Sequence, residues 1–433
     1  MSGGPFSSVR VVRERVAARF GERFELVSDW LGDYGWLALG GAIVVVAILQ
    51  LYGPLPAARS TVLLLAIGVA LVVWGLALRR ARRVLDTASR WGWPLIGAFA
   101  LLMVALQASG VLGDYWTTIL LELFMFAVLA LSWDLVGGQT GYPSFGNMAF
   151  FGVGAYTSAI LVKHYAWGLF PAFAVAGVAA VVFAAFIGLI VLRLRGHYFA
   201  IATLGVLLAS TQIALNLEIT NGSSGIILLY VGGGLNDFLL ETFALSQQGL
   251  TYYLMLTILL GEIAVVYFLT DTRFGYILNT IRDDEQKATS MGINTTYYKT
   301  GAWMLAALFT GLVGAVWAPY STFVNPAQAF NTAWNVEMIV MAFLGGPGTV
   351  AGPVLGAFGL GGFIFQIETF FSGWQLAVLG VAVILTVVAF PQGLVGQLRE
   401  RASAMEYFKH GGGAAGQGGE PGTEVTDGGT DQP

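Results

Sequence analysis

Residues 271–299 read DTRFGYILNTIRDDEQKATSMGINTTYYK and lie between two strongly apolar runs, 252–270 and 301–320. Each flanking run is long enough to cross a bilayer, which takes about 20 predominantly apolar residues. No other long segment in the second half of the chain that lies between two such runs is comparably polar and charged. We therefore take this segment as the connection between two membrane spans.

The segment itself has the pattern of a one-sided helix. Asp271 and Thr272 can cap its start, and Gly292 can end it in a left-handed turn. Apolar side chains recur between these ends at helical spacing, at Phe274, Ile277, Leu278, Ile281, Ala288 and Met291. A helix of this kind has to bury its apolar stripe, either on lipid headgroups or on a soluble partner, and its residues alone favour neither.

The composition is that of an integral membrane protein. The chain is 56% hydrophobic and 11% charged, whereas soluble domains carry roughly 25% charged residues. Its 58 glycines suit closely packed membrane helices. Cys is absent, which excludes disulfides and thiolate metal sites, and the three His residues lie far apart in the sequence. Metal and redox chemistry therefore have little support.

The apolar runs predict an all-α polytopic membrane protein with about 10–12 transmembrane helices. The runs cover residues 35–52, 60–78, 94–113, 116–136, 148–163, 169–192, 198–216, 252–270, 301–320, 336–346, 353–371 and 374–390. The run at 336–346 is too short to cross alone and the run at 148–163 is marginal. Both adjoin glycine-rich turns, so we expect some helices to be discontinuous or re-entrant.

The positive charges predict the topology, because Lys and Arg concentrate in cytoplasmic loops. If the N-terminus is inside and every run crosses, all 21 Lys and Arg residues except Arg59 and Lys163 fall on the inner side. Both termini and residues 271–299 are then cytoplasmic. The external stretch 217–251 contains no positive charge.

The two ends of the chain differ from the membrane region. Residues 1–34 are predicted to form an Arg-rich cytoplasmic arm. Residues 399–433 form a cytoplasmic tail that becomes Gly-rich and purely acidic from Gly411 onward, and we predict that it is disordered.

No pattern for catalysis stands out. The chain lacks a phosphate-binding loop of the form G-x-x-x-x-G-K-[S/T], and no Ser/His/Asp arrangement suggests a nucleophile. Glu122 and Glu262 are the carboxylates placed deepest in apolar runs, which leaves ion coupling possible.

Two glycine-rich turns, 137–141 and 345–348, form a weak internal repeat on the cytoplasmic side. Uncharged polar residues around the first turn could line a solute path or satisfy a broken helix: Gln139, Thr140, Ser144 and Asn147.

Several motifs, in this order, resemble the LivM-type permease subunits of branched-chain amino acid ABC transporters. They are LSWDLVGGQTGYPSFGNMAFFGVGAYTSAIL (131–161), RLRGHYFAIATLG (193–205), TNGSSGI (220–226), FGYILNTIRDDEQKATSMGIN (274–294), FLGGPGTVAGPVLGA (343–357) and PQGLVG (391–396). The resemblance covers about 115–398, which is the expected permease transmembrane domain. Residues 35–114 are then additional N-terminal transmembrane helices.

The resemblance implies a multi-pass transport subunit of the cell membrane rather than an enzyme. Such a subunit pairs with a sister permease and is driven by two cytoplasmic ATP-binding subunits. An extracytoplasmic solute-binding protein delivers the amino acid. ATP and Mg would be bound by the partner subunits, so no cofactor is expected on this chain.

The resemblance also assigns roles to residues. Residues 271–299 match the family's coupling loop, which enters a cleft on the ATP-binding subunit. The positions carried over are Arg282, Asp283, Asp284, Glu285, Ala288, Met291 and Gly292, and Thr289 departs from the family pattern, where Glu is common. Asn221, Gly222 and Gly225 are candidates for docking the solute-binding protein, and the polar residues from Gln139 to Asn147 for the translocation path.

Two other functions stay open on the sequence. Substrate choice is expected to reside mainly in the binding protein, so urea or short amides are possible in place of branched-chain amino acids. An ion-coupled secondary transporter acting alone is the further alternative, because the deep carboxylates would suit it.

Overall fold

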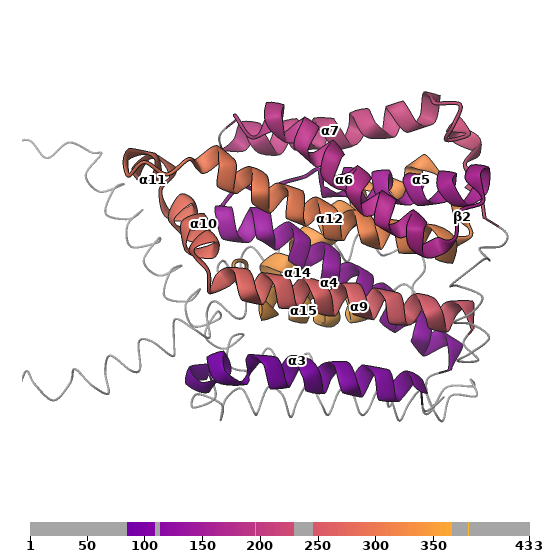
Figure 1. Ribbon diagram of the computed structural model, residues 1–433, viewed down its shortest axis with the longest axis horizontal. Coiled ribbons are helices and arrows are strands. Elements are labelled where there is room, and N and C mark those ends of the chain that lie inside the picture. Colours follow the sequence, from indigo (N-terminus) through magenta and orange to yellow (C-terminus); the bar gives the residue numbers. More distant parts are fainter. Residues whose placement is uncertain (1–84, 109–112, 195, 229–245, 366–379, 381–433) are drawn as a thin grey trace, which may run out of the picture.

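The fold is known from a computed structural model, which describes residues 85–108, 113–194, 196–228, 246–365 and 380 (Figure 1). Its described part is all-α apart from one short pair of strands. The predicted spans at 35–52, 60–78 and 374–390, the N-terminal arm and the acidic tail lie outside the described residues. The class predicted from the sequence, an all-α polytopic membrane protein, is confirmed.

Five helices in the described part are long and apolar enough to cross a membrane: α4 (Asp114–Thr140), α6 (Leu169–Val191), α7 (His197–Asn216), α9 (Gln247–Thr270) and α12 (Thr295–Ser321). Two further long helices are α3 (Leu85–Ala108) and α5 (Asn147–Tyr165). The marginal run at 148–163 is thus one continuous helix of 19 residues. At 1.5 Å per residue it extends about 28 Å, close to the thickness of the hydrocarbon layer.

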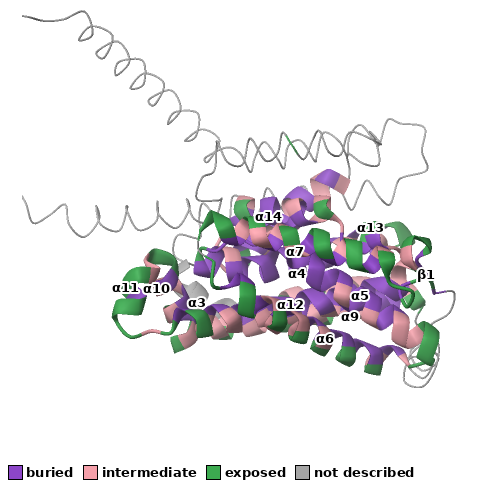
Figure 2. Ribbon diagram, turned by 90° about the horizontal axis from the view of Figure 1, so that it is seen from above, coloured by how far each residue is buried: buried purple, intermediate pink, exposed green. Residues whose placement is uncertain are grey.

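Helix α12 lies at the centre of the bundle and packs against α4, α5, α6 and α9 (Figure 1). Figure 2 shows the buried residues concentrated on the helices at the middle, with exposed residues along the outer helices. The contact between α5 and α12 depends on close backbone approach, because a Cβ built on Gly154 would lie 2.0 Å from the carbonyl oxygen of Gly311. Small residues at such positions are the usual way in which membrane helices come together.

Buried polar groups also join the helices. The Ser132 hydroxyl of α4 donates to Oε1 of Glu262 on α9 at 2.6 Å, and both side chains are fully buried. The indole nitrogen of Trp303 on α12 donates to the carbonyl oxygen of Ala184 on α6 at 3.1 Å. Glu262, one of the deep carboxylates, therefore contributes to the α4–α9 contact.

The short run at 336–346 is α14 (Thr332–Gly345), a helix of 14 residues. A glycine turn separates it from α15 (Ala351–Gly356), which continues into the π-helical turn η3 (Ala357–Gly361). The chain folds back on itself here, and the backbones of Gly345 and Gly352 come into close contact. A Cβ on Gly345 would lie 1.7 Å from the carbonyl oxygen of Gly352. The expected interruption of the helix is confirmed at this position. Whether the unit is re-entrant in the membrane stays a prediction.

One end of the bundle is closed by the two strands. Residues Ile226–Ile227 (β1) pair antiparallel with Phe323–Val324 (β2), with Ile226 opposite Val324. The short 3-10 helix η2 (Gly222–Ser224) precedes β1, and α13 (Pro326–Ala329) follows β2. The loops after α7 and α12 are thereby joined at the end opposite α10 (Arg273–Asp283) and α11 (Glu285–Ser290) (Figure 1).

The α5–α12 approach yields a stability prediction. Replacing Gly154 by Ala forces a methyl group against the backbone of α12, and such overpacking costs about 1–3 kcal/mol. The matched control is Gly261→Ala in the middle of α9, where a Cβ would meet nothing within 4 Å. Thermal unfolding of the detergent-solubilised protein should show a lower midpoint for G154A and an equal or higher one for G261A. Equal midpoints for the two variants would contradict the role of the close contact.

Candidate functional site

Residues 295–299 are the first residues of α12, and the rest of the 271–299 segment forms two helices rather than the single helix expected from the periodicity. They are α10 and α11, separated by Asp284, whose backbone is extended at φ −163° and ψ 103°. The Asp284 carboxylate accepts hydrogen bonds from the backbone nitrogens of Gln286 and Lys287 and so caps α11. These bonds, first of all that from Lys287, lower the pKa of Asp284. Gly292 adopts the expected left-handed conformation, with φ 84°.

The apolar stripe of this segment is buried or half-buried against the membrane helices, with the exception of Met291. Leu278, Ile281 and Ala288 are buried. Phe274 at the start of α10 packs on Tyr298 of α12, with ring centroids 5.5 Å apart. Met291, the last member of the predicted stripe, is 76% exposed because it follows the end of α11.

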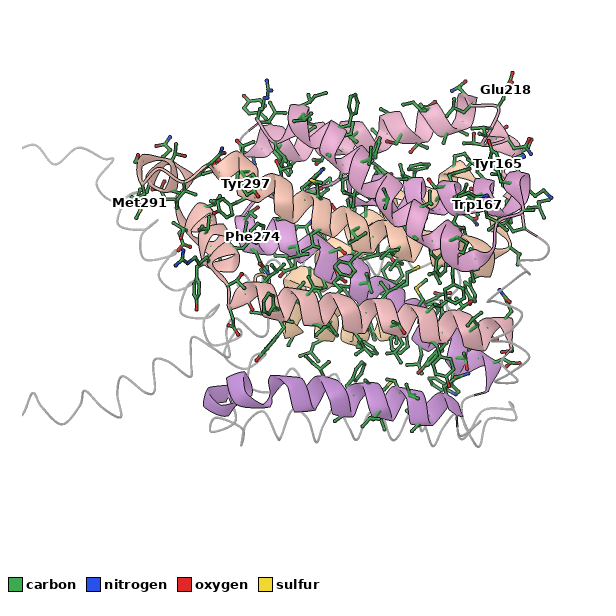
Figure 3. The ribbon with its side chains drawn as sticks, in the orientation of Figure 1. Tyr165, Trp167, Glu218, Phe274, Met291 and Tyr297 are labelled. Carbon is green, nitrogen blue, oxygen red and sulfur yellow. The ribbon has the colours of Figure 1, made fainter. Side chains whose placement is uncertain are left out.

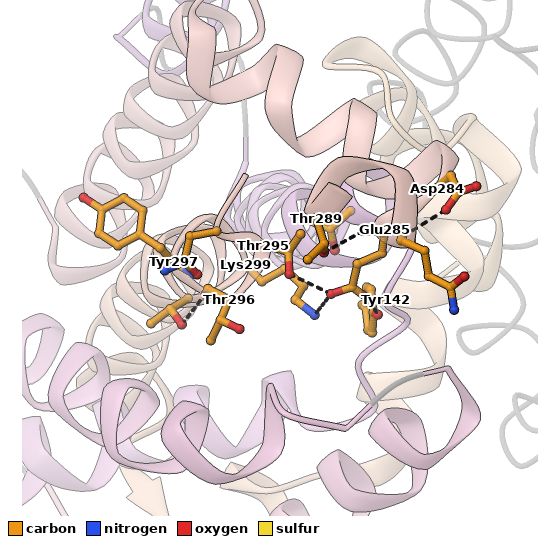
Figure 4. A network of polar contacts seen from close by, with 12 residues as sticks. Tyr142, Asp284, Glu285, Thr289, Thr295, Thr296, Tyr297 and Lys299 are labelled. Atoms are coloured by element: carbon orange, nitrogen blue, oxygen red, sulfur yellow. Dashed lines mark hydrogen bonds and ion pairs between the residues drawn. The ribbon is translucent and has the colours of Figure 1, made fainter. Parts of the chain in front are cut away.

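The Glu285 carboxylate joins α11 to α12 and to the turn between α4 and α5 (Figure 4). Its Oε1 accepts from Nζ of Lys299 at 2.6 Å and from the hydroxyl of Thr295 at 2.9 Å, both on α12. Its Oε2 accepts from the hydroxyl of Tyr142, in the turn between α4 and α5. We call these four side chains the Glu285 network. Lys299 also lies over the Tyr142 ring, 4.3 Å from its centroid.

The ion pair in this network is largely shielded from water. Lys299 is 3% exposed and Glu285 13% exposed. Burial acts to raise the pKa of the Glu285 carboxyl, but the hydrogen bonds from Lys299, Tyr142 and Thr295 outweigh it, and the pKa is lowered. The carboxylate therefore stays charged at neutral pH, and its charge holds α11 against α12.

Arg282, at the end of α10, reaches the two glycine turns. Its Nη1 donates to the carbonyl oxygen of Gly138 in the last turn of α4, at 3.1 Å. The backbone nitrogen of Gly348, in the second turn, donates to Oδ1 of Asp134 on α4 at 2.7 Å. The two turns that form the weak sequence repeat thus meet beside one side chain. We call Asp134, Gly138, Arg282 and Gly348 the Arg282 seat.

Other residues of the segment face away from the bundle. The Asp283 side chain is 78% exposed, and its distance to Nε of Arg282 is 3.9 Å. Tyr276 and Tyr297 are 64% and 69% exposed, and Met291 and Tyr297 lie at the α11 end of the bundle (Figure 3). Thr289, where the sequence departs from the family pattern, is exposed, and its hydroxyl donates to the carbonyl oxygen of Glu285. The segment therefore presents an outward face with aromatic, apolar and charged groups.

The four translocation-path candidates all lie around the turn between α4 and α5, and all are buried. The hydroxyl of Thr140 donates to the carbonyl oxygen of Val136 within α4, and the hydroxyl of Ser144 accepts from the backbone nitrogen of Gly146. Within the described residues, Nε2 of Gln139 and both side-chain polar atoms of Asn147 have no hydrogen-bond partner. Their role in a path stays a prediction. Their turn also contains Tyr142 and so touches the Glu285 network.

The three docking candidates lie at the opposite end of the bundle, around η2. Asn221, Gly222 and Gly225 all have positive φ, and the Asn221 amide donates to the carbonyl oxygen of Gly225 at 2.9 Å. A Cβ on Gly225 would lie 2.6 Å from the carbonyl oxygen of Val324, so this glycine permits the β1–β2 pairing. Asn221 is exposed at this end. Docking of a binding protein here is not tested by these contacts.

The sequence does not predict the residues that Arg282 and Glu285 contact within the bundle. On the sequence, Lys299 is only the last residue of the 271–299 segment, and no pattern assigns Tyr142, Thr295 or Asp134 to the site. A Lys at the start of an apolar run, 14 positions after a Glu, is a weak signal for their pairing. The 144-residue separation of Arg282 and Gly138 left no signal at all.

Comparison with known proteins adds an independent finding. The family model described as "Branched-chain amino acid transport system / permease component" matches residues 115–388. The chain is 28% identical to the high-affinity branched-chain amino acid transport system permease protein LivM of Escherichia coli K12, over 75% of this chain and 90% of the relative. It is 27% identical to the protein of the same name from Salmonella typhimurium LT2, over 69% and 74%. No solved structure matches the chain significantly.

The lowered pKa of Glu285 yields a prediction on pH. Because the folded-state pKa lies below the unfolded value, the network stabilises the protein above the unfolded pKa, and that contribution is lost as pH falls through the folded pKa. E285Q should unfold at a lower temperature than wild type at pH 7, and its midpoint should fall less steeply on acidification. The exposed Asp283→Asn change is the matched control. Parallel pH curves for wild type and E285Q would contradict the assignment.

Proposed function

The chain belongs to the permease family of branched-chain amino acid transport systems, and on that premise we propose that it is one half of the membrane path of an ABC importer. A sister permease forms the other half in the cell membrane. Two cytoplasmic ATP-binding subunits bind ATP and Mg and drive the pair. An extracytoplasmic solute-binding protein delivers the substrate, so this chain carries no ATPase site or cofactor of its own.

The observation that carries the proposal is the two-sided 271–299 segment. Its inward face is held by Leu278, Ile281, Ala288 and the Glu285 network. Its outward face leaves Met291, Tyr276 and Tyr297 exposed, and Met291 and Tyr297 lie at the α11 end of the bundle (Figure 3). The distribution of Lys and Arg favours a cytoplasmic location for this end. A rigidly held segment with an exposed apolar and aromatic face is suited to a soluble partner, because such side chains dominate the energy of protein interfaces.

We propose the following transport cycle for the importer. Closure of the two ATP-binding subunits on ATP draws the two coupling segments together, and the membrane helices attached to them rotate. The path between the permeases then opens toward the loaded binding protein, and hydrolysis resets it. The ATP-binding subunits bind ATP with different affinity in the two states of the whole complex, and ATP therefore shifts the populations of these states.

The substrate proposed is a branched-chain or other apolar amino acid. Its ammonium and carboxylate need a few polar groups along the path, and the region from Gln139 to Asn147 supplies amides and hydroxyls at the inner end. Docking of the binding protein is proposed at Asn221, Gly222 and Gly225, at the outer end. Urea or short amides remain the alternative substrates.

Purification of the chain from its native membrane, followed by reconstitution, tests the proposal. We expect two ATP-binding subunits and a sister permease to copurify, and ATP-dependent uptake of leucine, isoleucine or valine when the binding protein is added. Uptake of urea in place of leucine would select the alternative substrate class. Uptake by the chain alone, driven by an ion gradient without ATP, would establish a secondary transporter instead.

The outward face yields a separate prediction. Met291→Ser removes an exposed apolar side chain from the proposed interface and should reduce copurification of the ATP-binding subunits severalfold, as loss of an apolar interface contact does. Trp167→Ser is the matched control, because Trp167 is also exposed and apolar but lies at the other end of the helices (Figure 3). Quantitative mass spectrometry of the purified complexes measures both. Equal losses for the two variants would mean that Met291 does not belong to the interface.

A further inference from the structure

We propose that Arg282 is the positioning residue that passes movement of the coupling segment to the membrane helices, through the end of α4 and the glycine turn before α15. The proposal rests on the coupling role given above and extends it to a single side chain within this chain. In it, Arg282 acts on the membrane helices, whereas the outward face of the segment binds the ATP-binding subunit.

The first argument is that the C-terminal end of α4 has carbonyl groups without partners in the helix and no basic residue of its own. The last four carbonyl groups of a helix have no partner within it, and this end of the helix carries partial negative charge. The last turn of α4 contains no basic residue. Arg282 supplies the missing cation from another element, with Nη1 at 3.1 Å from the carbonyl oxygen of Gly138. The end of α4 is thus completed by the coupling segment.

The second argument is the shape of the seat. A Cβ on Gly348 would lie 2.4 Å from Nη1 of Arg282, and one on Gly141 would lie 3.1 Å from its Cγ. Both glycines have φ values in the left-handed region, 79° and 75°, which other residues rarely adopt. Both turns therefore leave free the space that the arginine fills.

The third argument is the connection onward from the seat. Gly348 is held to α4 by its hydrogen bond to Asp134, and a Cβ on Gly138 would lie 2.5 Å from the Gly348 nitrogen. The same turn joins α14 to α15. A displacement of Arg282 thus has to move the end of α4 and this turn together, or break the bond to Gly138.

The position of Arg282 on the segment suits this role. Its side chain is 39% exposed, so it lies at the boundary between the outward face and the membrane domain. Three residues later, Glu285 is fixed to Lys299 and Tyr142. The break at Asp284 therefore has one anchor on each side, and both α10 and α11 are tied to the bundle.

The test compares Arg282→Gln with Arg193→Gln in the complete complex, reconstituted with its binding protein. Arg193 is an exposed arginine just after α6 and outside the 271–299 segment, and no hydrogen bond or ion pair is found for it within the described residues. We expect R282Q to keep its ATP-binding subunits and its ATP hydrolysis, while leucine uptake per ATP hydrolysed falls about tenfold, since a charge-assisted hydrogen bond is lost. R193Q should match wild type. Arg282→Lys should recover part of the coupling, because an ammonium can still donate to the Gly138 carbonyl.

A distance measurement provides a readout independent of transport. The chain has no Cys, so spin labels on T289C and A351C, both exposed positions on either side of the seat, report the separation of α11 and α15. We expect this separation to stay constant when ATP binds to the otherwise unmodified complex and to change in R282Q.

Two results would overturn the proposal. One is loss of the ATP-binding subunits in R282Q, which would make Arg282 a docking contact. The other is wild-type uptake per ATP together with an unchanged label separation. A wild-type complex whose leucine uptake does not require ATP would instead refute the proposed importer function, so the two failures can be told apart.

Discussion

The polar groups at helix ends near a membrane surface have to be satisfied, because the hydrocarbon layer offers no water to replace a missing partner. In this chain the constraint is met at the α10–α11 end of the bundle by segments distant in sequence. Arg282 donates to the last turn of α4, and the Gly348 nitrogen donates to Asp134 of the same helix. The glycine turn before α15 and the 271–299 segment are both fixed to α4 as a result.

The Glu285–Lys299 pair holds α11 against α12 through an ion pair that is largely shielded from water. Moving two charges out of water is costly, and their attraction offsets this cost only when the remaining polar atoms are also satisfied. Here Thr295 and Tyr142 supply the additional donors to the carboxylate. The pair therefore adds less to stability than its short distance suggests. Its main effect is to define where α11 lies, because removing one partner leaves a charge largely shielded from water.

Hydrophobic periodicity predicted the described spans to within a few residues at most of their ends, since burial in a membrane depends on composition over long runs. The division into α10 and α11 was not predicted, because an aspartate within an amphipathic pattern reads equally well as a helix interior residue or as a cap. The predicted stripe failed at Met291, because α11 ends at Ser290 and Met291 lies beyond it. The Arg282 seat could not be predicted, because it depends on backbone groups of two turns whose proximity is a property of the folded bundle.

In the function proposed above, the 271–299 segment both binds a partner and moves the membrane helices, and these two tasks need separate groups. A donor already engaged within the chain can bind a partner only by breaking the internal bond, and this would release the helices that the partner has to move. The side chains follow this division. Arg282 and Glu285 direct their polar atoms into the bundle, whereas the side chains of Asp283 and Met291 are exposed. The break at Asp284 makes the division possible, because it gives α11 an orientation of its own and sets inward and outward groups side by side within a few residues.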